Sequence, residues 1–288
     1  MPSYTNFRDK SYNPHFLFSF IIIVENFILQ QLRLLTKIYS RKKEAFFRLK
    51  QEIQQAISDL DVTITSIIYD DSGFINLRLE GEEEVVASNY LSTLFGKSYR
   101  LDELDEGEII KGYICSSGKV GFGLFVDIGI KEPYATDALI PLFNLRDQLM
   151  EGLTVSTSKI INLYGLVDNF PIEITIEKVS IGLKQIEAKL SVDQVALFNR
   201  WLDENLEKLY IIGAFEEEIE EALYKTRHRQ DVIEIVQLGW MEYALTCKFN
   251  TTAKGLIPEL GKRLESVRLE IFQPAEIKRY MKERLKKE

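Results

Sequence analysis

The stretch SGKVGFGLFVDI, residues 117–128, decides how the middle of the chain folds. Its second half alternates, as a strand with one buried face does, and Phe125 falls on the outer face. Gly121 and Gly123 can bend the entry to this strand, which would turn Phe122 to the same side as Phe125. The residues predicted to fill the inner face are Leu124, Val126 and Ile128. The stretch therefore predicts a strand that carries an aromatic pair on its outer face.

Glycines in this stretch also raise the alternative of a loop that binds a phosphate group. Such a loop stands between a strand and a helix, so that backbone amides at the start of the helix meet the phosphate. Here a strand follows the glycines, and no Gly-Lys-Ser or Gly-Lys-Thr is present. We therefore exclude a phosphate-binding loop.

Short segments with strand character, separated by Gly and Asp or Asn, continue on both sides of this stretch. They read EIIKGYIC, GLFVDIG, DALIPL, SKIINLYG and FPIEITIEKV. Five short strands within about 75 residues are typical of a small β-barrel. The sequence therefore predicts a small five-stranded β-barrel over residues 99–180.

The segment before the barrel, residues 31–98, shows a different order. LRLLTKIY has strand character, RKKEAFFRLKQEIQQAISDL has apolar residues at helical spacing, and two alternating segments meet at a turn at 71–73. A further helix then ends at Gly96. The order strand, helix, strand, strand, helix predicts a ferredoxin-like α/β sandwich.

Residues 181–288 contain both strand-like and helix-like segments, which predicts a C-terminal α+β domain that ends in a basic helix. The expected elements include a strand in KQIEAKLS, a helix VDQVALFNRWLDENLEKLY, a hairpin around Gly239 and the final helix AEIKRYMKERLKK. Trp201 falls on the apolar face of its helix, which predicts a core position. The whole chain is thus expected to be a multidomain α+β protein.

Residues 1–30 are expected to be an N-terminal extension. Its apolar run FLFSFIIIV is nine residues long, whereas a membrane-spanning helix needs about 20. We therefore expect no stable membrane insertion.

Composition excludes several function classes. A net charge of −8 argues against a protein that binds nucleic acid over its whole surface. The two cysteines and two histidines lack the spacing of a disulfide framework or a zinc site. No nucleophile or acid–base constellation is visible, so we expect no catalytic residues, no metal and no cofactor. A reducing cytoplasm is the expected location.

The segment GEIIKGYICSSGKVGFGLFVDIGI, followed by DALIPLFNL, resembles the OB-fold RNA-binding module of the ribosomal-protein S-one type. The residues at 112–114 match the Gly-x-Val of that family, and those at 122–126 match its Phe-Gly-x-Phe-Val. The chain departs from the family at Pro141, where the family has a histidine. The resemblance implies binding of single-stranded or structured RNA by a non-catalytic factor in translation or transcription.

The candidate RNA-binding residues follow from this resemblance and from the strand pattern. Phe122 and Phe125 would stack on bases, Tyr113 would assist, and Lys111 and Lys119 would meet phosphates. The local charge opposes this, because residues 99–150 hold five basic and nine acidic side chains, a net charge of −4. A secondary basic patch would comprise Lys225, Arg227, Arg229, Lys278, Arg279 and Lys282.

Two other readings of the aromatic pair stay open. The same barrel face would serve a protein-interaction module, with ribosomal or transcription-machinery proteins as partners, since an acidic chain can bind basic proteins. Alternatively, both rings would be buried against a neighbouring domain. Exposed rings surrounded by lysine or arginine would favour RNA, and an apolar or acidic surround would favour a protein partner.

Over most of its length the chain also resembles an uncharacterised archaeal family, defined by the domain of unknown function 2110. The segments that carry this resemblance are ASNYLSTLFG, the barrel stretch and LGWMEYALTCKFNTTAKGLIPELG. The resemblance implies an archaeal cytoplasm and supplies no activity or catalytic residues.

Overall fold

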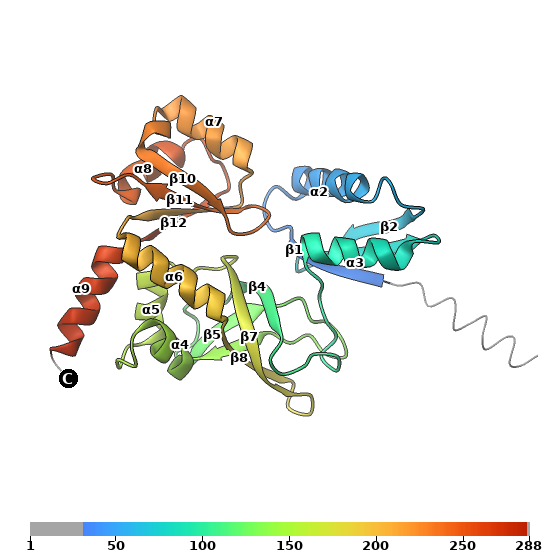
Figure 1. Cartoon of the computed structure of the whole chain (residues 1–288), viewed down its shortest axis with the longest axis horizontal. Helices are drawn as coiled ribbons and strands as arrows, with labels where there is room; N and C mark the ends of the chain where they lie inside the picture. The colour runs from blue at the N-terminus through green and yellow to red at the C-terminus, as the bar shows by residue number, and fades with distance from the viewer. Residues whose placement is uncertain (1–30, 287–288) are drawn as a thin grey trace, which may run out of the picture.

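The computed structural model describes residues 31–286, which form three units in series (Figure 1). A three-stranded sheet comes first, a closed five-stranded barrel lies in the middle, and a four-stranded sheet follows. The predicted multidomain α+β class is therefore confirmed. The expected N-terminal extension, with its apolar run, lies outside the described residues. No helix within the described part of the chain is long and apolar enough to cross a membrane.

The N-terminal unit has the predicted order of elements. All of its strand pairs are antiparallel, in the order β1-β3-β2, and its two helices carry buried apolar faces. This is the strand order of a ferredoxin-like sandwich without its fourth strand. The elements are β1 (Gln31–Lys37), α2 (Lys42–Ala56), β2 (Thr63–Tyr69), β3 (Phe74–Glu80) and α3 (Glu84–Phe95).

The place of the fourth strand is taken by a short segment that follows α3. The Leu35 amide donates to the Gly96 carbonyl at 3.1 Å, and the Ser98 amide donates to the Arg33 carbonyl at 2.9 Å. These bonds run antiparallel to β1 but form only an isolated bridge. After this bridge the chain leaves the sheet, and residues 99–108 connect it to the barrel.

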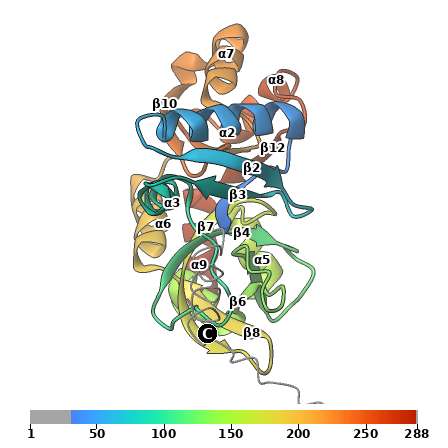
Figure 2. The same ribbon diagram turned by 90° about the vertical axis from the view of Figure 1, so that its right-hand side faces the viewer.

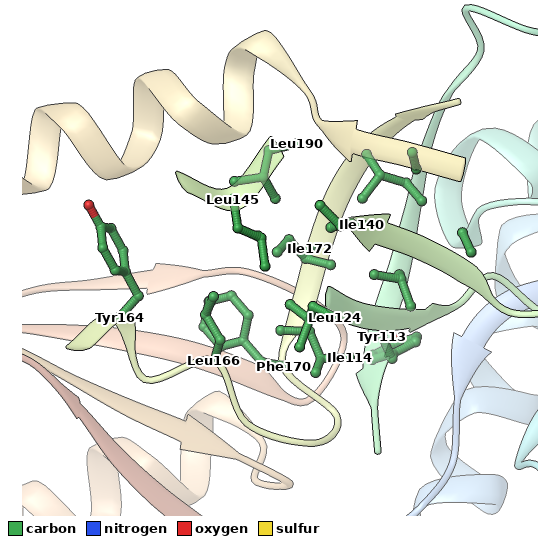
Figure 3. Close-up of a cluster of buried hydrophobic side chains, with 14 of the residues drawn as sticks. Tyr113, Ile114, Leu124, Ile140, Leu145, Tyr164, Leu166, Phe170, Ile172 and Leu190 are labelled. Atoms are coloured by element: carbon green, nitrogen blue, oxygen red, sulfur yellow. The ribbon is translucent and has the colours of Figure 1, made fainter. Parts of the chain in front are cut away.

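The barrel is closed and has the topology of an OB fold. Its strands follow the order β4-β5-β6-β8-β7, with β6 and β8 parallel and the other pairs antiparallel. Figure 3 shows one inward side chain from each strand: Ile114, Leu124, Ile140, Ile172 and Leu190. The strands are β4 (Ile109–Cys115), β5 (Gly123–Asp127), β6 (Ala138–Pro141), β7 (Pro171–Ser180) and β8 (Gln185–Leu190).

Two sequence predictions about the barrel are wrong. SKIINLYG forms the helix α5 (Thr157–Tyr164), which Ser156 caps by accepting from the Lys159 amide and which ends at a left-handed Gly165. The fifth barrel strand is instead β8, so the barrel extends beyond the predicted boundary at residue 180. A second unpredicted helix, α4 (Leu142–Leu149), precedes α5 between β6 and β7.

The C-terminal unit is a four-stranded antiparallel sheet in the order β10-β11-β9-β12, covered by helices. The predicted helix through Tyr210 is too long, because it ends at Glu204 and Asn205 caps it in the left-handed region at φ +54°. The fully buried strand β9 then follows. The elements are α6 (Val192–Glu204), β9 (Lys208–Ile212), α7 (Glu216–Thr226), β10 (Val232–Gln237), β11 (Glu242–Cys247), α8 (Ala253–Leu260), β12 (Arg268–Phe272) and α9 (Pro274–Leu285).

One hydrophobic core joins the barrel to the C-terminal unit. Its joint is a group of buried aromatic rings whose neighbouring centroids lie 4.8 to 6.3 Å apart: Tyr164, Phe170, Phe198, Trp201, Tyr210 and Phe272. The predicted core position of Trp201 is therefore confirmed. This joint fixes α9 beside α5 (Figure 1).

The N-terminal unit docks on one end of the barrel (Figure 2). Lys37 Nζ lies 3.0 Å from Asp127 Oδ2 at the end of β5, and the Ser98 hydroxyl donates to the Gly129 carbonyl at 2.7 Å. Gly129 has a φ of +77°, and a Cβ there would lie 3.1 Å from Ser98 and Leu35. The docking therefore needs a glycine, and it covers part of the outer barrel face.

Candidate functional site

The aromatic pair lies on the outer face of the barrel as the sequence predicts. The Phe122 side chain is exposed, with 58% of its residue surface open, and Phe125 is half-buried. Their ring centroids lie 6.0 Å apart at an interplanar angle of 88°, an edge-to-face contact. The pair thus presents one solvent-exposed ring, which packs edge-to-face against a second, half-buried ring.

The backbone on both sides of Phe122 is held in place. The Leu142 amide donates to the Phe122 carbonyl at 2.8 Å, and the Thr157 hydroxyl donates to the Gly121 carbonyl at 2.7 Å. A Cβ at Gly123 would come within 2.4 Å of the Ile140 carbonyl oxygen. This glycine is therefore required where β5 approaches β6, and the ring of Phe122 stands on a fixed loop.

Tyr113 does not belong to this surface, contrary to the sequence prediction. It is only 6% exposed, and its ring contacts Phe74 at 6.3 Å and lies 5.8 Å from Lys37 Nζ. Both neighbours come from the N-terminal unit, which covers this end of the outer face. Burial accordingly raises the pKa of the Tyr113 hydroxyl. Tyr113 is a docking residue between units and is closed to a base.

The two predicted lysines lie in different places on the barrel. Lys119 is exposed in the β4–β5 loop, three residues before Phe122, with Nζ 3.5 Å from the Ser116 hydroxyl. Lys111 is also exposed, but it is far from the pair. The strand partner of Phe125 is Cys115, and Lys111 precedes Cys115 by four residues, a distance of about 13 Å along β4. It lines a cleft of about 390 Å³ where all three units meet, together with Trp240. Only Lys119 therefore accompanies the aromatic pair.

A continuous row of outward residues crosses the barrel beside the pair. Strand pairing places Cys115 next to Phe125, Phe125 next to Leu139, and Leu139 next to Glu187. This row lies between two loops, β4–β5 and β7–β8. In OB folds the face of the second and third strands and these two loops form the ligand surface. Here those strands are β5 and β6.

The sequence reasoning missed the second of these loops. Lys184, directly before β8, places Nζ 3.8 Å from the centroid of the Tyr134 ring in the β5–β6 loop. Leu183 beside it is 71% exposed. The available signal is Lys184, the lysine that opens KQIEAKLS. It is missed because the sequence predicts a barrel strand in SKIINLYG and places KQIEAKLS in the C-terminal domain.

Acidic groups lie on this face beside the N-terminal unit. Desolvation and the nearby Asp127 carboxylate raise the pKa of Asp137, and desolvation together with Asp137 raises the pKa of the Cys115 thiol. A thiol whose thiolate is disfavoured is a poor nucleophile. Asp127 and Asp137 are thus acidic residues of the face, and the exposed lysines Lys119 and Lys184 stand in the two loops that flank it.

The predicted secondary basic patch is two separate surfaces. Lys225 of α7 pairs with Glu221, and Arg229, just after the end of α7, places Nε 2.9 Å from a Glu220 oxygen. These ion pairs neutralise both cations. Arg227 caps the same helix in the left-handed region. On α9 the predicted residues Lys278, Arg279 and Lys282 are exposed. Figures 1 and 2 place α7 at the end of the molecule opposite the barrel.

No cluster of three or more potential metal ligands occurs within residues 31–286.

Comparison with protein families gives three matches to domains of one family. The N-terminal domain model matches residues 31–100, the central domain model 104–202 and the C-terminal domain model 206–272. The chain belongs to the DUF2110 family. The central DUF2110 match includes β8, in agreement with the closed barrel. No curated protein matches the chain.

Proposed function

We propose that the barrel binds single-stranded RNA, without catalysis, as part of a ribonucleoprotein or a translation or transcription factor. The observation that carries this proposal is an edge-to-face pair on a closed OB barrel, in which the exposed ring of Phe122, directly before the second strand, contacts the half-buried ring of Phe125 on that strand. An exposed ring accepts any base by stacking, at about 1–3 kcal/mol per base. The archaeal origin and cytoplasmic location stay predictions.

The flanking loops support the proposal, because each holds an exposed lysine. Lys119 stands before Phe122, and Lys184 stands at the other end of the outward row. A strand that crosses β5 and β6 would meet one cation at each side of the stacked bases. The acidic end of the face would limit affinity, so we expect binding that depends strongly on salt.

Fluorescence anisotropy with labelled single-stranded RNA tests this proposal, over a salt range of about 50 to 200 mM. We expect Phe122→Ala/Phe125→Ala to lose about 2 kcal/mol or more of binding free energy, which is at least a 30-fold rise in Kd. The matched control is Phe249→Ala, which removes another exposed phenylalanine, in the C-terminal unit. Equal affinities of the native chain and the double variant would refute the role of the pair.

A second candidate is a docking face for a basic protein. The observation that favours it is the apolar and acidic surround, where Leu183 and Phe143 are 71% and 64% exposed and Asp137 and Glu187 lie nearby. Asp137→Asn/Glu187→Gln separates the two functions. This variant should tighten RNA binding by removing repulsion from phosphates, whereas it should weaken the binding of a basic protein.

A further inference from the structure

We infer that the RNA-binding surface continues from Phe122 across the start of α5 and onto helix α9, whose lysines and arginine bind phosphates. This inference rests on the proposed RNA binding by the barrel. It assigns to α9 the part of the site that supplies positive charge. It also explains how a barrel face with acidic residues would hold a polyanion.

Contacts connect the three parts of this surface. The Thr157 hydroxyl at the start of α5 donates to the Gly121 carbonyl at 2.7 Å, directly before Phe122. Two residues further, Lys159 Nζ lies 4.8 Å from the centroid of the Tyr280 ring on α9. Arg284 of α9 donates to the Thr154 carbonyl. The segment 154–159 therefore touches both the loop of Phe122 and helix α9.

The charge on α9 is not balanced by neighbours. Residues 274–286 hold five basic and two acidic side chains. Among the described residues, no carboxylate forms an ion pair with any of these five cations, whereas Lys225 of α7 and Arg229, just after α7, each have one. Lys278 and Lys282 are one helical turn apart and share a face. An exposed basic stripe of this kind suits a phosphate backbone.

Stabilisation of the helix dipole explains only some of the basic residues on α9. Cations stabilise a helix through the dipole within its last turn, which covers Lys282 and Arg284. Lys278 and Arg279 lie nearer the middle of α9, where this effect is lost. Lys278 Nζ lies 3.5 Å from the Asn205 side-chain oxygen. Among the described residues neither Lys278 nor Arg279 has a carboxylate partner, so both can bind an external anion. The twelve residues of α9 span about 18 Å, enough for several phosphates.

The experiment uses the full chain and two single-stranded RNAs of roughly 4 and 16 nucleotides, the range of site sizes for OB folds. The variant Lys278→Gln/Arg279→Gln/Lys282→Gln changes exposed side chains only. We expect the slope of log K against log salt for the longer RNA to fall by about 2, from three lost contacts at about 0.7 each. The short RNA should bind the variant as it binds the native chain.

The matched control is Lys225→Gln/Arg227→Gln/Arg229→Gln, which removes the same charge at the opposite end of the molecule. We expect it to leave the salt slope for both RNAs unchanged. An α9 variant with the native slope, or equal losses from both triple variants, would overturn the path over α9 while leaving the barrel site intact. A native chain that binds neither RNA would overturn the proposed function as well.

Discussion

Glu242 gives the sharpest test of how the three units are held together. Its carboxylate is buried where they meet, and it accepts a hydrogen bond from Tyr39 of the N-terminal unit. The Met241 amide also donates to it at 3.3 Å. Burial raises the pKa of Glu242 from 4.5 to about 7, although the Tyr39 hydroxyl, this amide and Lys37 act in the opposite direction.

The sign of the effect follows from the raised pKa. Between about pH 4.5 and pH 7 the folded chain holds a proton on Glu242 that the unfolded chain releases, so the free energy of unfolding falls as pH rises through this window. A rise of this size corresponds to about 3 kcal/mol over the whole window. Above about pH 7 the contribution of Glu242 stays constant.

We therefore predict that Glu242→Gln removes this part of the pH dependence. Urea unfolding of the native chain and the variant, followed by tryptophan fluorescence from about pH 5 to pH 8, measures the difference. The free energy of unfolding of the variant minus that of the native chain should increase by about 2 to 3 kcal/mol from about pH 5 to pH 8. Parallel profiles would refute the reasoning, because they would mean that Glu242 titrates as an exposed glutamate does.

Two further predictions concern single contacts. Gly123→Ala should lower the free energy of unfolding by about 1–3 kcal/mol, because the added Cβ would meet the Ile140 carbonyl; Gly121→Ala, with nothing within 4 Å, is the control, and equal denaturation midpoints would contradict the prediction. Lys37→Met should leave the Asp127 carboxylate without its ion-pair partner and lower stability by about 1–3 kcal/mol. Limited proteolysis should then cut between the N-terminal unit and the barrel sooner, and unchanged cleavage would count against this contact.

Local patterns predicted much of the fold. The alternation around Phe125 gave the central barrel strand, and the helical spacing in α2 together with the turn at 71–73 gave the N-terminal unit. Where periodicity was ambiguous, the prediction failed. The apolar residues of SKIINLYG suit a strand or a helix, and the buried strand β9 follows α6 after only three residues.

Contacts between distant segments could not be predicted. Closure of the barrel pairs β8 with β6 in parallel, and no local pattern in either strand specifies that partner. Tyr113 has the alternation of an outward residue, yet the docking of another unit buries it. Likewise, Lys184 and Tyr134 meet across fifty residues of sequence. The aromatic pair was predictable because both of its rings come from one short stretch.

Photo-crosslinking tests the central proposal most directly. Single-stranded RNA that carries thiouridine would be irradiated with the native chain, and the attached peptide would be identified by mass spectrometry after protease digestion. Our account predicts crosslinks in residues 117–128, at Phe122 or Phe125, and their loss when unlabelled RNA competes. Specific crosslinks confined to other surfaces, or none at concentrations where anisotropy detects binding, would contradict it.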